Sequence, residues 1–328
     1  MVADWKALAQ QVSNWGRWGE HDQLGTLNFI TPKKIAGAAT LARTGKVFSL
    51  CIPLNGDGPQ GGNGGRRNPI HLMTLDGGDA DLADKIGGWG GEFEASMHGM
   101  YTLGGPMRFN DDYIMMPLQS STQWDALAHV YYEDQLYNGY PANSVTSLGA
   151  TRNAIDKIAQ VGQILGRGVL LDVARAKGFD VLPPNTIITA QDLDDTARAQ
   201  GVTIEEGDIV VVRTGWWSTF TGYPQGGEWI MGSPGISWRV AEWLSDHNVA
   251  AIASDNIAVE VMPPEEGLFL LFHMLAIRDM GMMLGEIWDL EALGADCAAD
   301  GVYEFLLSAA PLEVSGGVGS PVNPLAIK

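Results

Sequence analysis

The sequence predicts an α/β fold. Short runs of β-branched and other apolar residues, typical of buried strands, alternate along the chain with longer segments that carry helical signals. The strongest strand signal is the run Ile-Val-Val-Val that begins at Ile209, because β-branched side chains favour extended structure. Strands that alternate with helices are characteristic of α/β proteins.

The other elements follow from local signals. Thr31 is a favourable N-cap and Pro32 suits a first helical turn, so we expect a helix over 32–44, ended by Gly45. Thr189 has N-cap chemistry and opens a helix that reaches about Gln200. Further helices are expected over 151–165, 237–247 and 289–299, and further strands over 47–54, 113–118, 168–173, 249–253 and 302–308.

The chain of 328 residues contains no convincing internal linker, so we expect one domain over 1–328. Residues 1–30, rich in Trp, Gly and charge, suggest an N-terminal arm that packs on the body. Two Gly-rich loops are expected at about 55–69 and 76–92. Long loops of this kind are either binding loops or surface excursions, and the sequence favours neither.

Composition excludes several classes of partner. The 39 acidic and 20 basic residues give a formal charge of −19, which repels nucleic acid and anionic membranes. No stretch approaches the roughly 18 apolar residues of a membrane span. With two cysteines and no signal-peptide pattern at the N-terminus, we expect a cytoplasmic protein. A small-molecule substrate, including an anionic one, remains compatible with this charge.

Residues 119–129 carry most of the functional information. Gln119, Gln123, Asp125 and His129 stand at even offsets, which would place their side chains on one face of an extended strand. Amide oxygens, carboxylates and imidazoles are all possible metal ligands. By spacing alone, a metal site and a polar sheet face remain alternatives.

A second polar pair lies far downstream in apolar surroundings. His273 stands in a strongly apolar run, and Glu286 follows between Met-Met-Leu and Ile-Trp. Charged groups are seldom buried without a partner or a metal. Taken alone, His273 fits a hydrogen-bonded core histidine, and Glu286 fits an ion pair with Arg278 or Arg213.

Together, the two segments resemble the putative cyclase family, which includes bacterial kynurenine formamidase and isatin hydrolase. The family signature is H-x-G-T-H-x-D-x-P-x-H followed by a distant His and Glu. The matching positions are Thr122, Asp125, His129, His273 and Glu286. At four positions the chain departs from the signature: Gln119 and Gln123 stand in place of metal-binding histidines, Ser121 in place of Gly and Leu127 in place of Pro.

The Gln-x-x-x-Gln-Trp-Asp form resembles the trans-dienelactone hydrolase-like branch. The resemblance extends over most of the chain, including Trp18–Asn28, Gly207–Gly215 and the Gly-Ser-Pro at 319–321. It implies a mixed, partly closed β-sheet with flanking helices, in the swivelling β/β/α style. It also implies a homo-oligomer, a dimer or a tetramer.

The resemblance implies a hydrolase that opens a small cyclic ester with metal-activated water. One divalent ion, Zn or Mn, is expected on Gln119, Gln123 and Asp125, and the expected catalytic residues are His129, His273 and Glu286. Candidates for substrate binding are Trp124, Trp216 or Trp217 for a ring, the loop histidines His71 and His98, and Arg66, Arg67 or Arg108 for a carboxylate. Core packing is the alternative for the tryptophans.

Two rival functions remain open. The same residues suit an amidase or imidase that acts on formamides or cyclic imides, because both reactions need activated water and a polarised carbonyl. Replacement of the two histidines by glutamines favours a metal-free ligand-binding protein or isomerase. No Gly-x-Ser-x-Gly elbow, phosphate loop or dinucleotide fingerprint is present in the required context.

Overall fold

The computed structural model describes residues 4–60, 65–78, 109–160, 164–222 and 226–328. His98, Arg108 and most of the expected loop at 76–92 lie outside these residues. Among the described residues, no helix combines the length and apolarity that crossing a membrane requires.

The core of the protein is a curled mixed sheet. Its four central strands are parallel and the strands on either side are antiparallel, so the predicted α/β fold with a mixed, partly closed sheet is confirmed. In spatial order the nine strands are β1 (Val47–Ser49), β15 (Leu325–Ile327), β13 (Glu304–Ser308), β7 (Leu165–Asp172), β9 (Ile209–Arg213), β11 (Ala251–Ser254), β12 (Met283–Glu286), β4 (Gln123–Asp125) and β14 (Gly319–Pro321).

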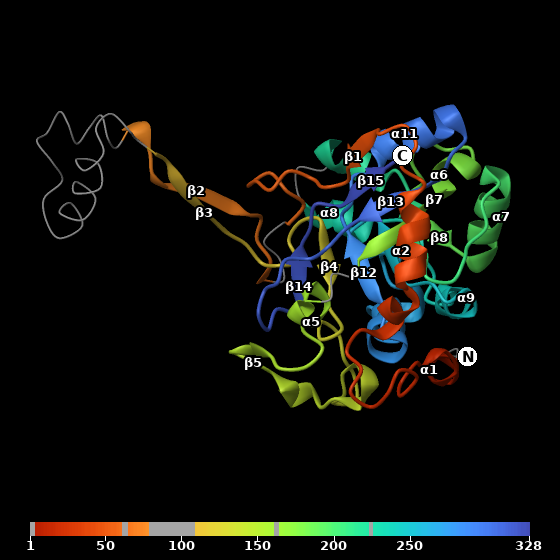
Figure 1. Ribbon diagram of the computed structural model, residues 1–328, viewed down its shortest axis with the longest axis horizontal. Coiled ribbons are helices and arrows are strands. Elements are labelled where there is room, and N and C mark those ends of the chain that lie inside the picture. The colour runs from red at the N-terminus through yellow and green to blue at the C-terminus, as the bar shows by residue number, and fades with distance from the viewer. Residues whose placement is uncertain (1–3, 61–64, 79–108, 161–163, 223–225) are drawn as a thin grey trace, which may run out of the picture.

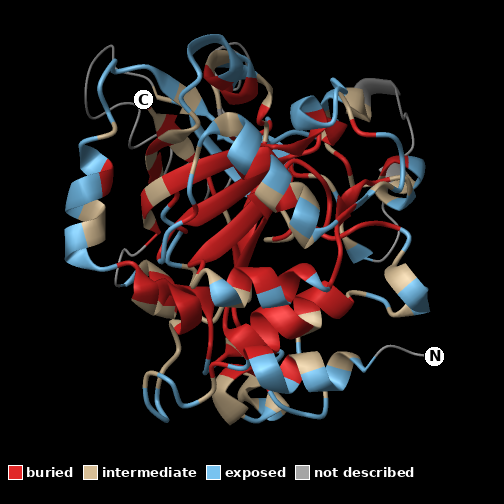
Figure 2. Ribbon diagram, turned by 90° about the vertical axis from the view of Figure 1, so that its right-hand side faces the viewer, coloured by how far each residue is buried: buried red, intermediate tan, exposed pale blue. Residues whose placement is uncertain are grey.

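Helices cover both faces of this sheet, and Figure 2 shows the buried strands enclosed by them. Alternate residues of the central strands belong to two separate apolar clusters, as expected for side chains that point to opposite faces. One face packs against α1 (Trp5–Val12), α7 (Ala190–Gln200), α9 (Val240–Asp246), α10 (Leu271–His273) and the π-helix η7 (Met274–Met280). The other packs against α5 (Ile155–Ala159) and α11 (Glu291–Asp300).

The smaller elements connect these layers. They comprise the helices α2 (Pro32–Ala39), α6 (Val173–Ala176) and α8 (Gly226–Met231), the short helices η1 (Gly25–Phe29), η3 (Tyr137–Gly139), η4 (Ala142–Ser144), η5 (Trp216–Gly222) and η6 (Glu265–Gly267), and the strand pairs β5 (Val145–Thr146) with β6 (Gly149–Ala150) and β8 (Ile187–Ile188) with β10 (Gly235–Ile236).

The predicted capping chemistry is confirmed. Thr189 accepts a hydrogen bond from the Asp192 amide while the Asp192 carboxylate accepts one from the Thr189 amide, so α7 begins with a complete capping box. Thr31 caps α2, but this helix ends at Ala39, before Gly45. The helix expected over 151–165 is limited to Ile155–Ala159, because strand pairing with β13 takes the chain from Leu165 onward.

The strand expected over 113–118 is displaced. β3 (Asp111–Met115) pairs only with β2 (Ile70–Leu75), and Figure 1 shows this two-stranded ribbon standing away from the body. Four large side chains without charge gather on one face of the ribbon, since Ile70 lies opposite Met115 and Leu72 lies opposite Tyr113. All four of these side chains are exposed. The end of β3 is separated from β4 by a turn around Gln119, so the ribbon does not continue into the sheet.

Candidate metal centre

The candidate site lies where β12 ends beside the antiparallel strand β4. Glu286, the last residue of β12, pairs directly with Gln123, and Leu284 pairs with Asp125. Residues that lie directly opposite each other on neighbouring strands share a face of the sheet. Gln123, Asp125 and Glu286 therefore project toward the same layer, which contains α10 and η7. All three side chains are buried.

The extended conformation that would align the even-numbered positions of 119–129 covers only the centre of this segment. Only Gln123–Asp125 is a strand, with a turn on each side. Even spacing accounts for Gln123 and Asp125 on one face. The turns, rather than strand periodicity, decide where Gln119 and His129 lie.

His273 completes the cluster from the helical layer. It lies at the junction of α10 and the π-helix η7, a kind of irregularity that is frequent at functional sites. Its Nε2 is 3.0 Å from Glu286 Oε1 and 3.9 Å from Asp125 Oδ2. One ligand atom from each of Asp125, His273 and Glu286 lies within 4.8 Å of the others, so the three can share one metal ion.

Gln123 links the two carboxylates. Its Nε2 donates to Glu286 Oε2 at 2.6 Å and to Asp125 Oδ1 at 3.4 Å. Its Oε1 is buried without a hydrogen-bond partner, and so is Asp125 Oδ2. Buried polar atoms are seldom left without a partner, and these orphaned oxygens at the centre of the cluster indicate that the site accepts a ligand.

Glu260 is the residue of this site that the sequence analysis missed. Its Oε1 accepts a hydrogen bond from His273 Nδ1 at 2.5 Å and one from the His273 amide at 3.2 Å. This contact fixes the imidazole ring and leaves Nε2 directed at Asp125 and Glu286, as in the carboxylate–histidine pairs of metal sites. Glu260 lies in the apolar run Ile-Ala-Val-Glu-Val-Met, so the reasoning applied to Glu286 would have identified it.

The backbone beside both glutamates adopts an unusual conformation. Val259 precedes Glu260 with φ 57°, and Ile287 follows Glu286 with φ 58°. Positive φ is strained for β-branched residues and costs about 1–3 kcal/mol, so it persists only where surrounding contacts enforce it. Asn256 supplies such contacts, because its side chain accepts from the Val259 amide and donates to the Val259 carbonyl.

The buried charges shift one another's pKa values. Burial disfavours the imidazolium of His273, but its hydrogen bonds to Glu260 and Glu286 outweigh burial and raise its pKa to about 10. Burial also raises the pKa of Asp125 to about 6, against the attraction of His129. Burial lowers the pKa of His129, although Asp125 opposes the shift. His129 is therefore biased toward its neutral form and His273 toward its charged form.

Three predicted residues lie around this centre. His129 Nε2 is 3.7 Å from Asp125 Oδ1 and 3.4 Å from Arg66 Nη2. The Gln119 side chain occupies the space beside Gly319, where a Cβ atom would lie only 2.4 Å from Gln119 Nε2. Gly319 pairs with Asp125 across β14 and β4, so Gln119 lies next to Asp125. Its Nε2 is buried without a partner.

Other expected substrate contacts lie elsewhere. Trp124 stands between Gln123 and Asp125 in β4, so it points to the opposite face, where it donates to the Ala309 carbonyl and packs against Trp288. Trp124 therefore packs in the core, which was the alternative to binding a substrate ring. His71 is exposed on the ribbon, where it contacts Asp112, and Arg67 is exposed on its loop. Trp216 is buried and donates to the Trp229 carbonyl, and Trp217 is partly buried beside it.

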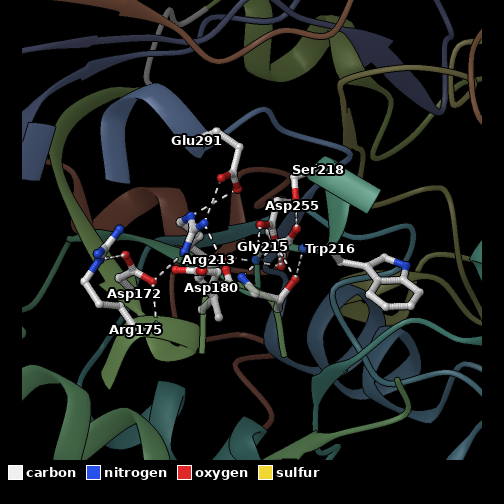
Figure 3. A network of polar contacts seen from close by, with 12 residues as sticks. Asp172, Arg175, Asp180, Arg213, Gly215, Trp216, Ser218, Asp255 and Glu291 are labelled. Carbon is white, nitrogen blue, oxygen red and sulfur yellow. Dashed lines mark hydrogen bonds and ion pairs between the residues drawn. The ribbon is translucent and has the colours of Figure 1, made fainter. Parts of the chain in front are cut away.

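Neither arginine considered for Glu286 contacts it. Figure 3 shows Arg213 paired instead with Asp172 and Glu291, at 2.9 and 2.8 Å. The Asp255 carboxylate in the same network accepts from the amides of Thr214 and Gly215. Arg278 pairs with Asp279 at 2.6 Å. Among the described residues, the Glu286 carboxylate instead forms hydrogen bonds with His273 and Gln123.

The donor set fits a divalent metal. Asp125, Glu260 and Glu286 are three buried carboxylates, and within the described part of the chain His273 is the one cationic group that is hydrogen-bonded to this set. Buried anions need compensating charge, and a divalent cation supplies it. Imidazole nitrogen with carboxylate and amide oxygens suits first-row metals such as Zn and Mn. Fold and site together define an α/β protein with a candidate metal centre between β12 and β4 of its sheet.

Comparisons with known proteins show the family to which this α/β protein belongs. The chain matches the family model described as Putative cyclase over residues 48–261. A solved structure described as a novel cyclase is 40% identical, with a TM-score of 0.84, over 97% of this chain and 100% of that chain. The chain belongs to the putative cyclase family.

More distant structures share the fold. Isatin hydrolase A from Ralstonia solanacearum is 19% identical with a TM-score of 0.60, over 89% of this chain and 95% of that chain. A predicted metal-dependent hydrolase from Bacillus stearothermophilus is 16% identical with a TM-score of 0.51, over 87% of this chain and 98% of that chain. No curated protein was found to match the chain.

Proposed function

We propose that this protein is a metal-dependent hydrolase that opens a small cyclic ester, a lactone of the dienelactone type. The observation that supports it is the buried cluster of Asp125, His273 and Glu286, whose ligand atoms lie within 4.8 Å of one another. Fold relatives described as isatin hydrolase and as a predicted metal-dependent hydrolase support the reaction class.

Asp125, Glu286 and His273 would hold one Zn or Mn ion, and His273 would release its Nε2 proton when the metal binds. Gln123 and Gln119 would offer neutral amide oxygens nearby. A bound divalent metal supplies an activated water and polarises the carbonyl of the substrate. Glu260 holds the His273 ring in place through Nδ1. His129, which is more exposed than Asp125, would accept a proton and return it to the leaving oxygen.

An amidase or imidase is the second candidate, because the same residues suit an amide carbonyl, and isatin hydrolase shares the fold. A metal-free binding protein or isomerase is the third, since two glutamines stand where the family signature has histidines. The charge balance of the site favours the hydrolases, because His273 alone does not balance three buried carboxylates, whereas a divalent cation would.

Metal content provides the direct test. We expect about one Zn or Mn ion per chain in untagged protein that was purified without added metal, measured by elemental mass spectrometry. The metal-loaded protein should hydrolyse lactones faster than formamides and cyclic imides of similar size, and a chelator should abolish turnover. A chain that contains no metal and gains none on titration would refute the hydrolase and leave the binding protein or isomerase.

We also propose that the chain forms a homo-oligomer, a dimer or tetramer, through the ribbon of β2 and β3. A two-stranded ribbon is at best marginally stable alone. The face formed by Ile70, Leu72, Tyr113 and Met115 is exposed and uncharged. A second copy of this acidic chain meets no like charge on these four side chains, whereas the chain as a whole carries a formal charge of −19.

The oligomer can be tested by native mass spectrometry. We expect the wild-type chain to be a dimer or tetramer and Leu72→Ser to shift it toward monomer. Met73→Ser, on the opposite face of the same strand, is the matched control and should leave the assembly unchanged. A monomeric wild-type chain, or equal effects of both substitutions, would contradict this interface.

A further inference from the structure

Arg66 brings a positive charge to the rim of the candidate metal centre. It lies in the segment that leads into β2, and its guanidinium is partly buried. Nη2 lies 3.4 Å from His129 Nε2, and Nη1 lies 3.4 Å from the Gln119 carbonyl oxygen. Both contacts are longer than ordinary hydrogen bonds. Arg66 thus reaches the site from a different part of the chain than the proposed metal ligands.

The donors of Arg66 are largely unused. A guanidinium offers five N–H groups, and here the only acceptors in reach among the described residues are an imidazole and one backbone carbonyl. Within the part of the chain that the structure describes, no carboxylate forms an ion pair with Arg66. By contrast, Arg167, Arg213 and Arg278 pair with carboxylates at 2.6–2.9 Å. Arg66 is thus a cation without a carboxylate partner among the described residues, and it contacts His129, which lies 3.7 Å from Asp125.

We propose that Arg66 binds a carboxylate of the substrate, so the preferred substrates are small rings that carry a carboxylate group beside the bond to be hydrolysed. This inference rests on the proposed function and names its substrate class. The planar fork of a guanidinium matches a carboxylate in a two-point contact. In a protein of net charge −19, a local cation at the site is what allows an anionic substrate to approach.

The position of Arg66 sets the orientation of such a substrate. Arg66 contacts His129, and His129 in turn lies 3.7 Å from Asp125 in the metal cluster. A ring whose carboxylate is held by Arg66 therefore extends past His129 toward Asp125 and Glu286. Its carbonyl group then lies on the metal side of His129, where the proposed chemistry takes place. Arg67, the next residue, is exposed and does not share this position.

The test compares two substrates that differ only in charge: a γ-butyrolactone with a ring carboxylate and the same lactone with a neutral carboxamide. For metal-loaded wild-type protein we expect a clear preference for the carboxylate. Arg66→Gln should lower kcat/KM for the carboxylate by about 10- to 100-fold, the loss expected for a hydrogen-bonded charge pair, and leave the carboxamide within about twofold. Arg67→Gln is the matched control and should change neither.

Three results would overturn the inference. One is a wild-type enzyme without preference for the carboxylate. Another is an equal loss on both substrates in Arg66→Gln, which would place Arg66 at the reacting carbonyl instead. The third is a Tm loss in Arg66→Gln large enough to account for its lower activity.

A binding measurement separates this inference from the proposed hydrolysis. Tetrahydrofuran carboxylate has the ring and the charge but no ester to open. Isothermal titration calorimetry should show that Arg66→Gln binds it about 10-fold more weakly than wild type or Arg67→Gln, even if neither lactone is hydrolysed. Failure of hydrolysis with this difference intact would refute only the proposed function. Equal affinities would refute the role of Arg66.

Discussion

Glu286→Gln is expected to abolish stoichiometric metal binding and to lower turnover by at least about 1,000-fold. The change keeps the size of the side chain but removes a buried negative charge that contacts both His273 and Gln123. Loss of metal-supplied charge stabilisation costs several kcal/mol in the transition state, which corresponds to a factor of this size. Asp125→Asn should act in the same direction. Elemental mass spectrometry and kcat with a lactone substrate measure the two effects.

Glu260→Gln is the informative comparison, because Glu260 contacts His273 on the side away from the cluster. A residue that only orients a metal ligand changes affinity by about 10- to 100-fold. We therefore expect this variant to bind about one metal ion per chain at saturation, with weaker affinity. If Glu286→Gln retains full metal content and turnover in a folded protein, the site assignment is wrong. If Glu260→Gln loses the metal completely, Glu260 is itself a ligand.

Arg213→Met is expected to be the most destabilising of the substitutions considered. Arg213 is 4% exposed and Asp172 is 1% exposed, so the variant leaves a buried carboxylate whose remaining cationic partner, among the residues that the structure covers, is Arg175. Removing one partner of a buried ion pair costs about 3–5 kcal/mol. For a chain of this length, that corresponds to a fall in Tm of roughly 5 °C or more. Thermal unfolding followed by circular dichroism measures it.

Arg198→Met provides the control. Arg198 pairs with Asp195 on α7, but their side chains are 71% and 54% exposed. Exposed pairs contribute little to stability because solvent screens them, so this variant should unfold within about 1 °C of wild type. Equal shifts in Tm for the two variants would show that the network of Figure 3 contributes no more than a surface pair.

Several features of the fold were predictable because neighbouring residues encode them. The β-branched run of β9 and the capping box of α7 are local signals, and both formed as expected. The predicted helix over 151–165 was too long because strand pairing overrode the local helical preference. At Leu165 the chain already belongs to β7, which pairs with β13. The ribbon of β2 and β3 was missed because its pairing lies between segments that are separated by more than thirty residues of sequence.

Some properties of the candidate site were likewise predictable from short stretches of sequence. Period-two alternation places Gln123 and Asp125 together and, read strictly, also excludes Trp124 from their face. Apolar surroundings mark His273, Glu286 and Glu260 as ionisable groups that need partners. These are properties of short segments, and the sequence by itself determined them.

Tertiary structure alone decided which of these groups meet. The pairing of β4 with β12 brings Glu286 to Gln123, and the packing of α10 over that face brings His273 to both. Tertiary structure also decides that Arg66, and not Arg67, lies at the rim of the site. In the same way, it decides that Arg213 pairs with Asp172 and not with Glu286. The physical reason is that side-chain direction follows from local backbone geometry, whereas contacts between distant segments depend on how whole layers pack and which buried charges find partners.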